Sequence, residues 1–146
     1  MKSRTETTIA KFQDGYNCAQ SVLYSFSDDI GLDRNAALKM ACGFGAGMGR
    51  KEEVCGAVSG GIIAIGVKYG RGEKDDRTST ELTYAKTRKL MDQFVQRHGT
   101  FICRRLLNGC ELTTDKGQSQ YKENNLSEKV CSRCIQSAVE ILEGAI

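Results

Sequence analysis

The sequence predicts an all-α, single-domain helical bundle of about six helices around a central, buried, glycine-rich helix at residues 54–68. First, residues 55–67 form the least polar run of the chain, with no charged residue before Lys68, and a helix that is apolar on every side is buried on every side. Second, no segment shows the polar–apolar alternation of a strand. Third, the chain has 16 glycines and no proline, which suits helices joined by glycine turns.

The composition indicates one globular domain over residues 1–146, with an unusual number of cysteines. Hydrophobic content of 40% and charged content of 27% are ordinary for a globular protein. A net charge of +3 is too small to indicate nucleic-acid binding. No apolar segment follows Met1, so we expect no signal peptide, and the central run is too short and glycine-rich for a membrane span. Seven cysteines in a protein that we expect to be cytoplasmic favour redox chemistry or metal binding over a disulfide scaffold.

The central helix is predicted to pack closely against neighbouring backbones. Gly56, Gly60 and Gly61 remove side chains from one flank, at a cost of roughly 1 kcal/mol each relative to alanine, so close packing must offset them. The preceding glycine-rich loop, residues 43–50, lacks the full phosphate-binding pattern. We expect it to let the backbone approach Cys55, with Glu52 and Glu53 in the first turn of the helix.

Three helices are predicted before this loop. Residues 3–13 have a weak helical pattern, and the next helix runs to about Asp28 from an Asn17–Gln20 capping box. Cys18 would take the first helical position, where amide groups and the helix dipole favour a thiolate. A third helix, over residues 34–42 with Asp33 as its cap, ends at Cys42.

After the central helix, a long helix is predicted from Asp75 or Asp76 to about His98. Its expected inner face is Leu82, Tyr84, Leu90, Met91, Phe94 and Val95. Thr100 can cap a short helix over residues 101–107, in which Cys103 lies beside Arg104 and Arg105. Both arginines and the free amides would lower the pKa of that thiol. Residues 113–125 are polar without periodicity and are expected to form an exposed loop.

The last helix is predicted to start at a Ser127 cap and to carry a C-x-x-C pair. Its inward stripe is Cys131, Cys134, Ile135, Ala138 and Leu142. No βαβ pattern surrounds the pair, as a thioredoxin-like motif would require, and Ile135 stands where c-type haem attachment needs a histidine. The pair alone cannot complete a four-ligand zinc site.

Taken together, the cysteines follow a recognisable order: Cys18, then Cys55-Gly56-Ala57-x-x-Gly60, then Cys103, then Cys131. This order resembles the redox-active protein family known by its C_GCAxxG_C_C cysteine pattern. Flanking similarities cover residues 16–20, 43–50, 103–107 and 139–142. The resemblance extends over nearly the whole chain and implies a small helical protein with a redox role. Three cysteines stand outside the four-cysteine pattern, namely Cys42, Cys110 and Cys134.

Three functions remain open from the sequence. The first is thiol–disulfide exchange or electron transfer. The enzyme class would be a thiol–disulfide oxidoreductase, and the partner would be a redox protein or a small thiol or disulfide. Its candidate catalytic residues are Cys18, Cys55, Cys103, Cys131 and Cys134. The second is a zinc or iron–sulfur site with ligands from several helices, namely Cys18, Cys55, Cys103 and Cys131. The third is a structural or interaction protein whose cysteines are buried and inert. Cofactor, cysteine pairing and homo-oligomer formation are not determined by the sequence.

Overall fold

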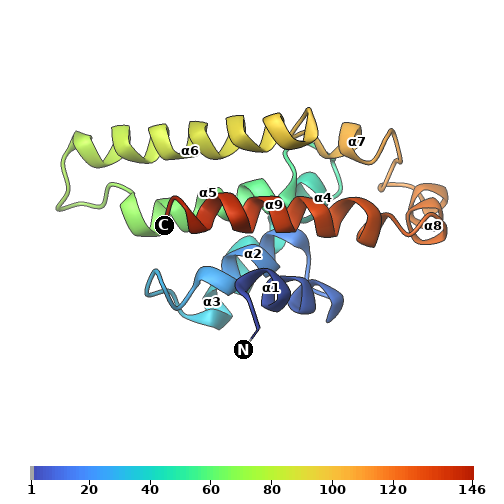
Figure 1. The fold of residues 1–146 in the computed structure, drawn as a ribbon, viewed down its shortest axis with the longest axis horizontal. Helices are drawn as coiled ribbons and strands as arrows, with labels where there is room; N and C mark the ends of the chain where they lie inside the picture. The colour runs from blue at the N-terminus through green and yellow to red at the C-terminus, as the bar shows by residue number, and fades with distance from the viewer. Residues whose placement is uncertain (1) are drawn as a thin grey trace.

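Helices α5 (Gly56–Tyr69) and α9 (Ser132–Glu143) run through the centre of the protein, in a computed structural model that describes residues 2–146. Helix α6 (Arg77–His98) packs along one side of this pair, and α2 (Cys18–Phe26) lies on the other side (Figure 1). The main core draws its buried side chains from all four of these helices. The predicted all-α, single-domain bundle is therefore confirmed.

Two further helices complete the body of the bundle. Helix α1 (Arg4–Gln13) contacts α2 and α9, and α3 (Arg34–Ala41) contacts α2. No strand occurs within residues 2–146, where the one extended pairing is an isolated antiparallel bridge between Val54 and Ile102. None of the helices in this part of the chain combines the length and apolar composition that crossing a membrane requires.

Gly56, Gly60 and Gly61 of α5 face its neighbours, as the sequence predicted. A Cβ atom at Gly60 would lie 2.6 Å from the carbonyl oxygen of Ala19, and one at Gly61 would lie 2.9 Å from a methyl group of Leu142. The helix can approach α2 and α9 this closely only because these positions have no side chain. The close packing offsets the low helix propensity of glycine. The helix begins at Gly56, so Cys55 is its N-cap residue and not its second residue.

Most of the predicted helix ends are confirmed. Asn17 and Gln20 form the expected reciprocal capping box, and Asp33 and Asp76 cap α3 and α6 through their side chains. The last turn of α6 is tied to α9 by a contact of 2.8 Å between His98 Nε2 and Ser137 Oγ. These local signals depend only on neighbouring residues, which explains why the sequence was sufficient to place them.

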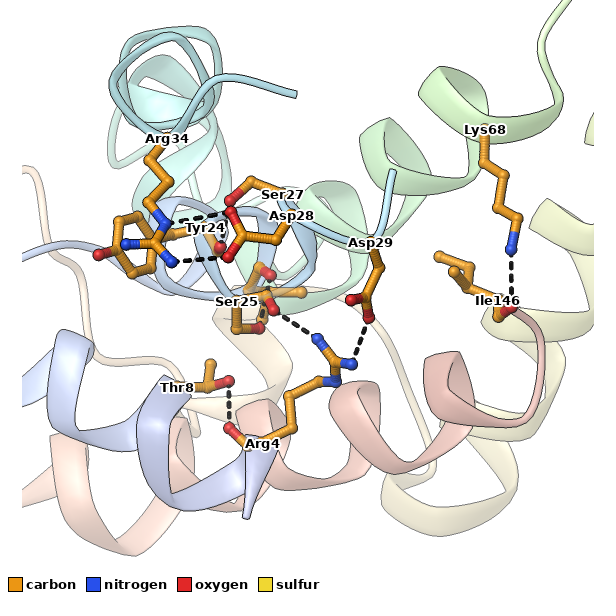
Figure 2. Close-up of polar contacts among 11 residues, drawn as sticks. Arg4, Thr8, Tyr24, Ser25, Ser27, Asp28, Asp29, Arg34, Lys68 and Ile146 are labelled. Atoms are coloured by element: carbon orange, nitrogen blue, oxygen red, sulfur yellow. Dashed lines mark hydrogen bonds and ion pairs between the residues drawn. The ribbon is translucent and has the colours of Figure 1, made fainter. Parts of the chain in front are cut away.

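The end of the bundle formed by the C-terminal turn of α2 and the start of α1 is closed by charged contacts, which Figure 2 shows. The guanidinium group of Arg4 donates to the carbonyl oxygen of Ser25 and pairs with Asp29, so it links α1 to the turn that follows α2. Arg34 pairs with Asp28, with a distance of 2.6 Å between Nη2 and Oδ2. This end of the bundle is fixed by polar contacts at its surface and contains no cysteine.

The expected inner face of α6, the expected length of the next helix and its expected Thr100 cap were wrong. Leu82 and Tyr84 were assigned to the inner face of α6, but their side chains are 44% and 56% exposed, because the buried contacts of this helix concentrate on Leu90 and Phe94. The helix after it, α7 (Cys103–Leu106), is shorter than the predicted 101–107. Thr100 does not cap it; its hydroxyl accepts a hydrogen bond from the amide of Ile102.

The segment predicted as an exposed loop contains a helix, α8 (Asp115–Glu123). Thr114 caps it by accepting a hydrogen bond from the amide of Gly117 at 2.9 Å. Gly117 lies directly against the backbone of Glu111, where a side chain would not fit. The segment is polar and has little apolar periodicity, which explains why the sequence pattern did not reveal the helix. Its start is held by the contacts of Thr114 and Gly117.

Two short stretches of the chain differ from expectation, one at the start of the last helix and one before α5. The predicted Ser127 cap is wrong, because the final helical stretch begins with a π-helical segment, η2 (Ser127–Cys131), whose N-cap residue is Leu126. Before α5, the glycine-rich loop folds into η1 (Cys42–Phe44) and α4 (Gly45–Met48). Both elements lie beside the start of α5 or α9, at the end of the bundle where α7 and α8 also lie (Figure 1).

Candidate functional site

A cavity of about 270 Å³ lies at this end of the bundle and is lined by five of the seven cysteines. They come from five elements or their ends: Cys18 from α2, Cys55 from the N-cap of α5, Cys103 from α7, Cys131 from η2 and Cys134 from α9. The four cysteines of the predicted pattern are therefore brought together, and Cys134 joins them. All seven cysteines are free thiols in the structure.

Cys18 is positioned by the capping box and by the glycine at the start of α5. The Asn17 side chain caps α2 and also donates to the carbonyl oxygen of Cys42, at 2.9 Å. A Cβ atom at Gly56 would lie 3.2 Å from the Cβ of Cys18. Because Gly56 has no Cβ, the first turns of α2 and α5 lie close enough for their cysteines to share one cavity.

Cys55 and Cys103 are held together by backbone hydrogen bonds. The amide of Cys55 donates to the carbonyl oxygen of Phe101 at 2.7 Å, and the amide of Cys103 donates to the carbonyl oxygen of Glu53 at 2.6 Å. These bonds flank the bridge between Val54 and Ile102. The pairing is incompatible with the predicted placement of Glu52 and Glu53 in a first helical turn, because residues 53–55 are extended.

Glu52 occupies an unusual place beneath this pairing. It is 2% exposed, it has a φ of 59°, and its Oε1 accepts a hydrogen bond from the amide of Leu112 at 2.9 Å. Oε2 has no partner among the described residues. The carboxylate anchors the segment before α8 to the segment before α5, so it supports the wall of the cavity without lining it.

Cys131 receives hydrogen bonds from two sides. The Cys18 thiol and the Tyr121 hydroxyl both donate to its sulfur, and the Tyr121 oxygen lies 3.3 Å away. Donation to the charged form favours the thiolate, so these bonds lower the pKa of Cys131 to about 7 in spite of burial. The same arrangement raises the pKa of Cys18. The main cause is its hydrogen bond with Cys131, and burial of the thiol and the negative charge of Cys131 add to it.

A second pair is built on Cys55. The pKa of Cys55 is lowered, first by hydrogen bonding with the Cys134 thiol and then by the backbone amides of Ala57 and Val58 at the start of α5, against the effects of burial and of the negative charge of Cys131. The pKa of Cys134 is raised, first because its proton is held by Cys55 and then because it is buried. The cavity therefore contains two neighbouring pairs, Cys131 with Cys18 and Cys55 with Cys134, and in each pair the pKa of the first member is lowered and that of the second is raised.

Two sequence-based expectations about ionisation were wrong. Cys18 was expected to be a thiolate at its helix N-terminus, but it is the donor of its pair. The pKa of Cys103 is raised and not lowered, because burial and the negative charges of Cys55 and Cys131 outweigh Arg104. The Arg104 side chain is half exposed, so solvent screens its charge.

The two remaining cysteines lie outside the cavity. Cys42 is exposed. Cys110 is buried in a smaller cluster with Leu107 and Leu112, and its thiol donates to the carbonyl oxygen of Gly117 at 3.1 Å. Neither is a member of the two hydrogen-bonded pairs.

The contact of Tyr121 with Cys131 and the buried position of Glu52 were not predicted from the sequence. Tyr121 lies in the segment that was predicted as a loop. The Thr114–Asp115 pair was the one available signal for a helix there, since threonine is a good N-cap and aspartate suits the first turn. No sequence signal could have identified Glu52 as buried, because its environment consists of residues distant in the chain.

The cavity does not fit the metal alternative. Although five thiols line it, no three histidine, cysteine, aspartate or glutamate side chains within residues 2–146 are arranged to hold a metal ion.

In comparisons with known proteins, the family model described as "Putative redox-active protein (C_GCAxxG_C_C)" matches residues 16–145. No curated protein matches the chain, and no solved structure does.

Proposed function

Because the chain belongs to the C_GCAxxG_C_C family of redox-active proteins, we propose that it performs thiol–disulfide exchange at the cysteine cavity. The observation that carries this proposal is the place of Cys131 in the cavity, where it lies with Cys18 and its sulfur accepts a hydrogen bond from the Tyr121 hydroxyl over 3.3 Å. Hydrogen bonding with Cys18 and Tyr121 lowers the pKa of Cys131 to about 7. A thiolate is the nucleophile in disulfide exchange, and a neighbouring thiol is needed to resolve the mixed disulfide. The Cys131–Cys18 pair supplies both groups.

The reaction has two displacement steps. The Cys131 thiolate attacks one sulfur of a substrate disulfide, whose S–S bond breaks, and the first leaving sulfur departs as a thiolate that takes a proton from solvent. Cys18 then attacks the Cys131 sulfur, and its proton passes to the second leaving sulfur. Two electrons reach the substrate, and a Cys18–Cys131 disulfide forms.

The order of these steps follows from the electrostatics. While Cys131 is negative, it holds the pKa of Cys18 high. Once Cys131 is bonded to the substrate sulfur, its negative charge and its role as acceptor are lost, so Cys18 deprotonates more easily. The resolving thiol is therefore activated only after the first step.

Cys55 and Cys134 form a second couple of the same design. Cys131 is partly exposed whereas Cys55 and Cys134 are buried, so Cys131 is the entry point for a substrate and the inner couple is reached by internal exchange. The pKa of Cys103 is raised, first by burial, so this thiol stays protonated. We assign the whole chain to one redox domain, in a reducing compartment such as the cytoplasm, with a separate reductant that restores the dithiols.

The test is alkylation of the fully reduced protein by iodoacetamide across a pH series, followed by mass spectrometry of each cysteine. We expect alkylation of Cys131 to rise through about pH 7, and one equivalent of diamide to yield a Cys18–Cys131 disulfide. A Cys42→Ser variant is the control, since Cys42 is exposed and outside the cavity. If no cavity cysteine ionises below an ordinary thiol, the proposal is wrong and the cysteines are structural. Metal analysis of the same sample tests the zinc or iron–sulfur alternative.

A further inference from the structure

We infer that the substrate of the cavity is a low-molecular-weight disulfide with an apolar body and one negatively charged end. This inference rests on the proposed thiol–disulfide exchange and adds the class of substrate to it. It is argued from the access to the sulfurs, the walls of the cavity and the charges that line it.

Access to the sulfurs excludes a folded protein as the direct substrate. Cys18, Cys55, Cys103 and Cys134 are between 2% and 8% exposed, and only Cys131 is partly open to solvent. Attack requires the substrate sulfur to lie in line with the thiolate, and the second step requires Cys18 to reach the same place. A cavity of about 270 Å³ admits a small molecule to that position, whereas a disulfide on a protein surface would be stopped at its opening.

The walls of the cavity are mainly apolar. Beside the cysteines, the lining contains the side chains of Phe12, Leu106, Leu107, Leu112 and Val130. Pockets of this kind bind the apolar part of a ligand and use a few polar groups to orient it. An apolar body between the disulfide and any charged group is therefore favoured over a zwitterionic disulfide such as cystine.

Apart from the cysteines, the charged side chains that line the cavity are cations. Arg50 and Lys122 are the charged side chains of its lining within residues 2–146, and no aspartate or glutamate lines it. Both cations are also exposed, so they lie where the cavity opens to solvent. The nearby Glu52 is buried and already bound by the Leu112 amide. The opening therefore attracts an anionic group.

The two kinds of charge in the site fix the shape of the ligand. A thiolate at Cys131, whose pKa is about 7, repels an anion inside the cavity, whereas Arg50 and Lys122 attract one at the opening. A ligand satisfies both when its carboxylate stays at the opening and an apolar chain carries its disulfide inward. The exchange then follows the two displacement steps given above, and the small disulfide leaves as a dithiol or as two thiols.

The test compares two probes that differ only in charge: lipoate, a cyclic disulfide on an apolar chain with a carboxylate, and its neutral amide, lipoamide. Under anaerobic conditions, reduced protein is mixed with each probe, and formation of the Cys18–Cys131 disulfide is followed by quenching and mass spectrometry. We expect lipoate to react roughly tenfold faster than lipoamide at low salt. This preference should decrease at about 0.5 M salt, because salt at that concentration screens the attraction between the carboxylate and the exposed cations.

The decisive variant is the double substitution Arg50→Ala with Lys122→Ala, which should abolish the preference for lipoate. Its matched control is Arg88→Ala with Lys89→Ala, which removes two exposed cations from α6 and should retain the preference. Equal rates for the two probes in the unmodified protein, or a preference that survives in the Arg50/Lys122 variant, would overturn the assigned substrate. Faster oxidation by insulin disulfides than by lipoate would also overturn it.

Failure of this inference differs from failure of the proposed function. Bis(2-hydroxyethyl) disulfide is small and neutral, and it should oxidise the Cys18–Cys131 pair whatever the role of the cations. If it does so while lipoate and lipoamide react equally, only the substrate class is wrong. If it forms no Cys18–Cys131 disulfide, the exchange function itself is wrong, and the substrate inference that rests on it is lost as well.

Discussion

The body of the bundle and its cysteine-bearing end are built in different ways. In the body, helices end at ordinary stops, and positive φ angles occur at glycines such as Gly31 and Gly99. Within residues 2–146, six residues other than glycine have positive φ, all in the segments before α5 and on either side of α8, and two of them line the cavity. They are Ala46, Met48, Arg50, Glu52, Asn108 and Asn125. Strained backbone of this kind persists where the surrounding structure enforces it, and it is concentrated at functional sites.

The two regions also differ in what they bury. The body buries apolar side chains such as Val22, Ile65 and Phe94, and it places its ion pairs at the surface. The cavity end buries thiols and the Glu52 carboxylate, one oxygen of which has no partner among the described residues. Burying polar groups costs free energy. The body thus supplies the stability that allows the cavity end to hold its reactive groups, and changes in the two regions should have separable effects.

The largest effect expected is on exchange activity, from Cys131→Ser. This variant lacks the entry thiolate, so reduction of bis(2-hydroxyethyl) disulfide should fall by at least about a hundredfold, consistent with loss of a catalytic nucleophile. Stability should change little, since serine is close in size and the position is partly exposed. Stopped-flow thiol assays and urea unfolding measure the two quantities. Cys110→Ser is the comparison, because it alters a buried cysteine outside the cavity.

The next largest effect should be on stability, from Gly60→Ala in the body. The new Cβ would lie 2.6 Å from the carbonyl oxygen of Ala19, so α2 and α5 must separate, at a cost of about 1–3 kcal/mol. Gly66→Ala is the control in the same helix, where a Cβ meets nothing within 4 Å, and it should stabilise by up to about 1 kcal/mol. Urea unfolding checks both. Equal stabilities would contradict the close approach of these helices.

A smaller effect is expected from Tyr121→Phe, which removes one donor to the Cys131 sulfur. Since the hydroxyl lowers the pKa of Cys131, its loss raises that pKa, and the thiolate forms at higher pH. Alkylation of Cys131 is expected to rise through about pH 7 in the unmodified protein, so the variant should react roughly three- to tenfold more slowly at neutral pH and recover at high pH. An unchanged pH profile would show that the hydroxyl does not stabilise the thiolate.

The smallest effect is expected from Leu82→Ala on α6. The residue is 44% exposed, so its truncation should change stability by less than about 0.5 kcal/mol. Phe94→Ala, which empties a fully buried position of the same helix, should cost about 3–5 kcal/mol. Thermal or urea unfolding of the two variants would show whether α6 is buried through Phe94 and not through Leu82. Similar losses would contradict this.

The features that the sequence predicted correctly are mostly local. The Asn17–Gln20 capping box, the Asp33 and Asp76 caps and the Gly99 stop each require only residues within one turn of the chain. The apolar run of α5 and the stripe of α9 depend on a periodicity that any helix imposes. Helix α8 was missed although its contacts, among Glu111, Leu112, Thr114, Gly117 and Gln118, are also local, because the segment is polar and has no apolar stripe to indicate a helix.

The sequence by itself determined the all-α fold class, the glycine-flanked central helix and the family to which the cysteine pattern belongs. Only the tertiary structure decided which thiols ionise. Helix position and adjacent arginines favoured Cys18 and Cys103, but the pKa values of Cys131 and Cys55 are the ones lowered, because Cys18 and Cys134 lie beside them in the cavity and hydrogen-bond with them. A pKa depends on burial and on groups within a few ångströms. For Cys55 that group is Cys134, and for Cys18 it is Cys131, and both partners are distant in the chain.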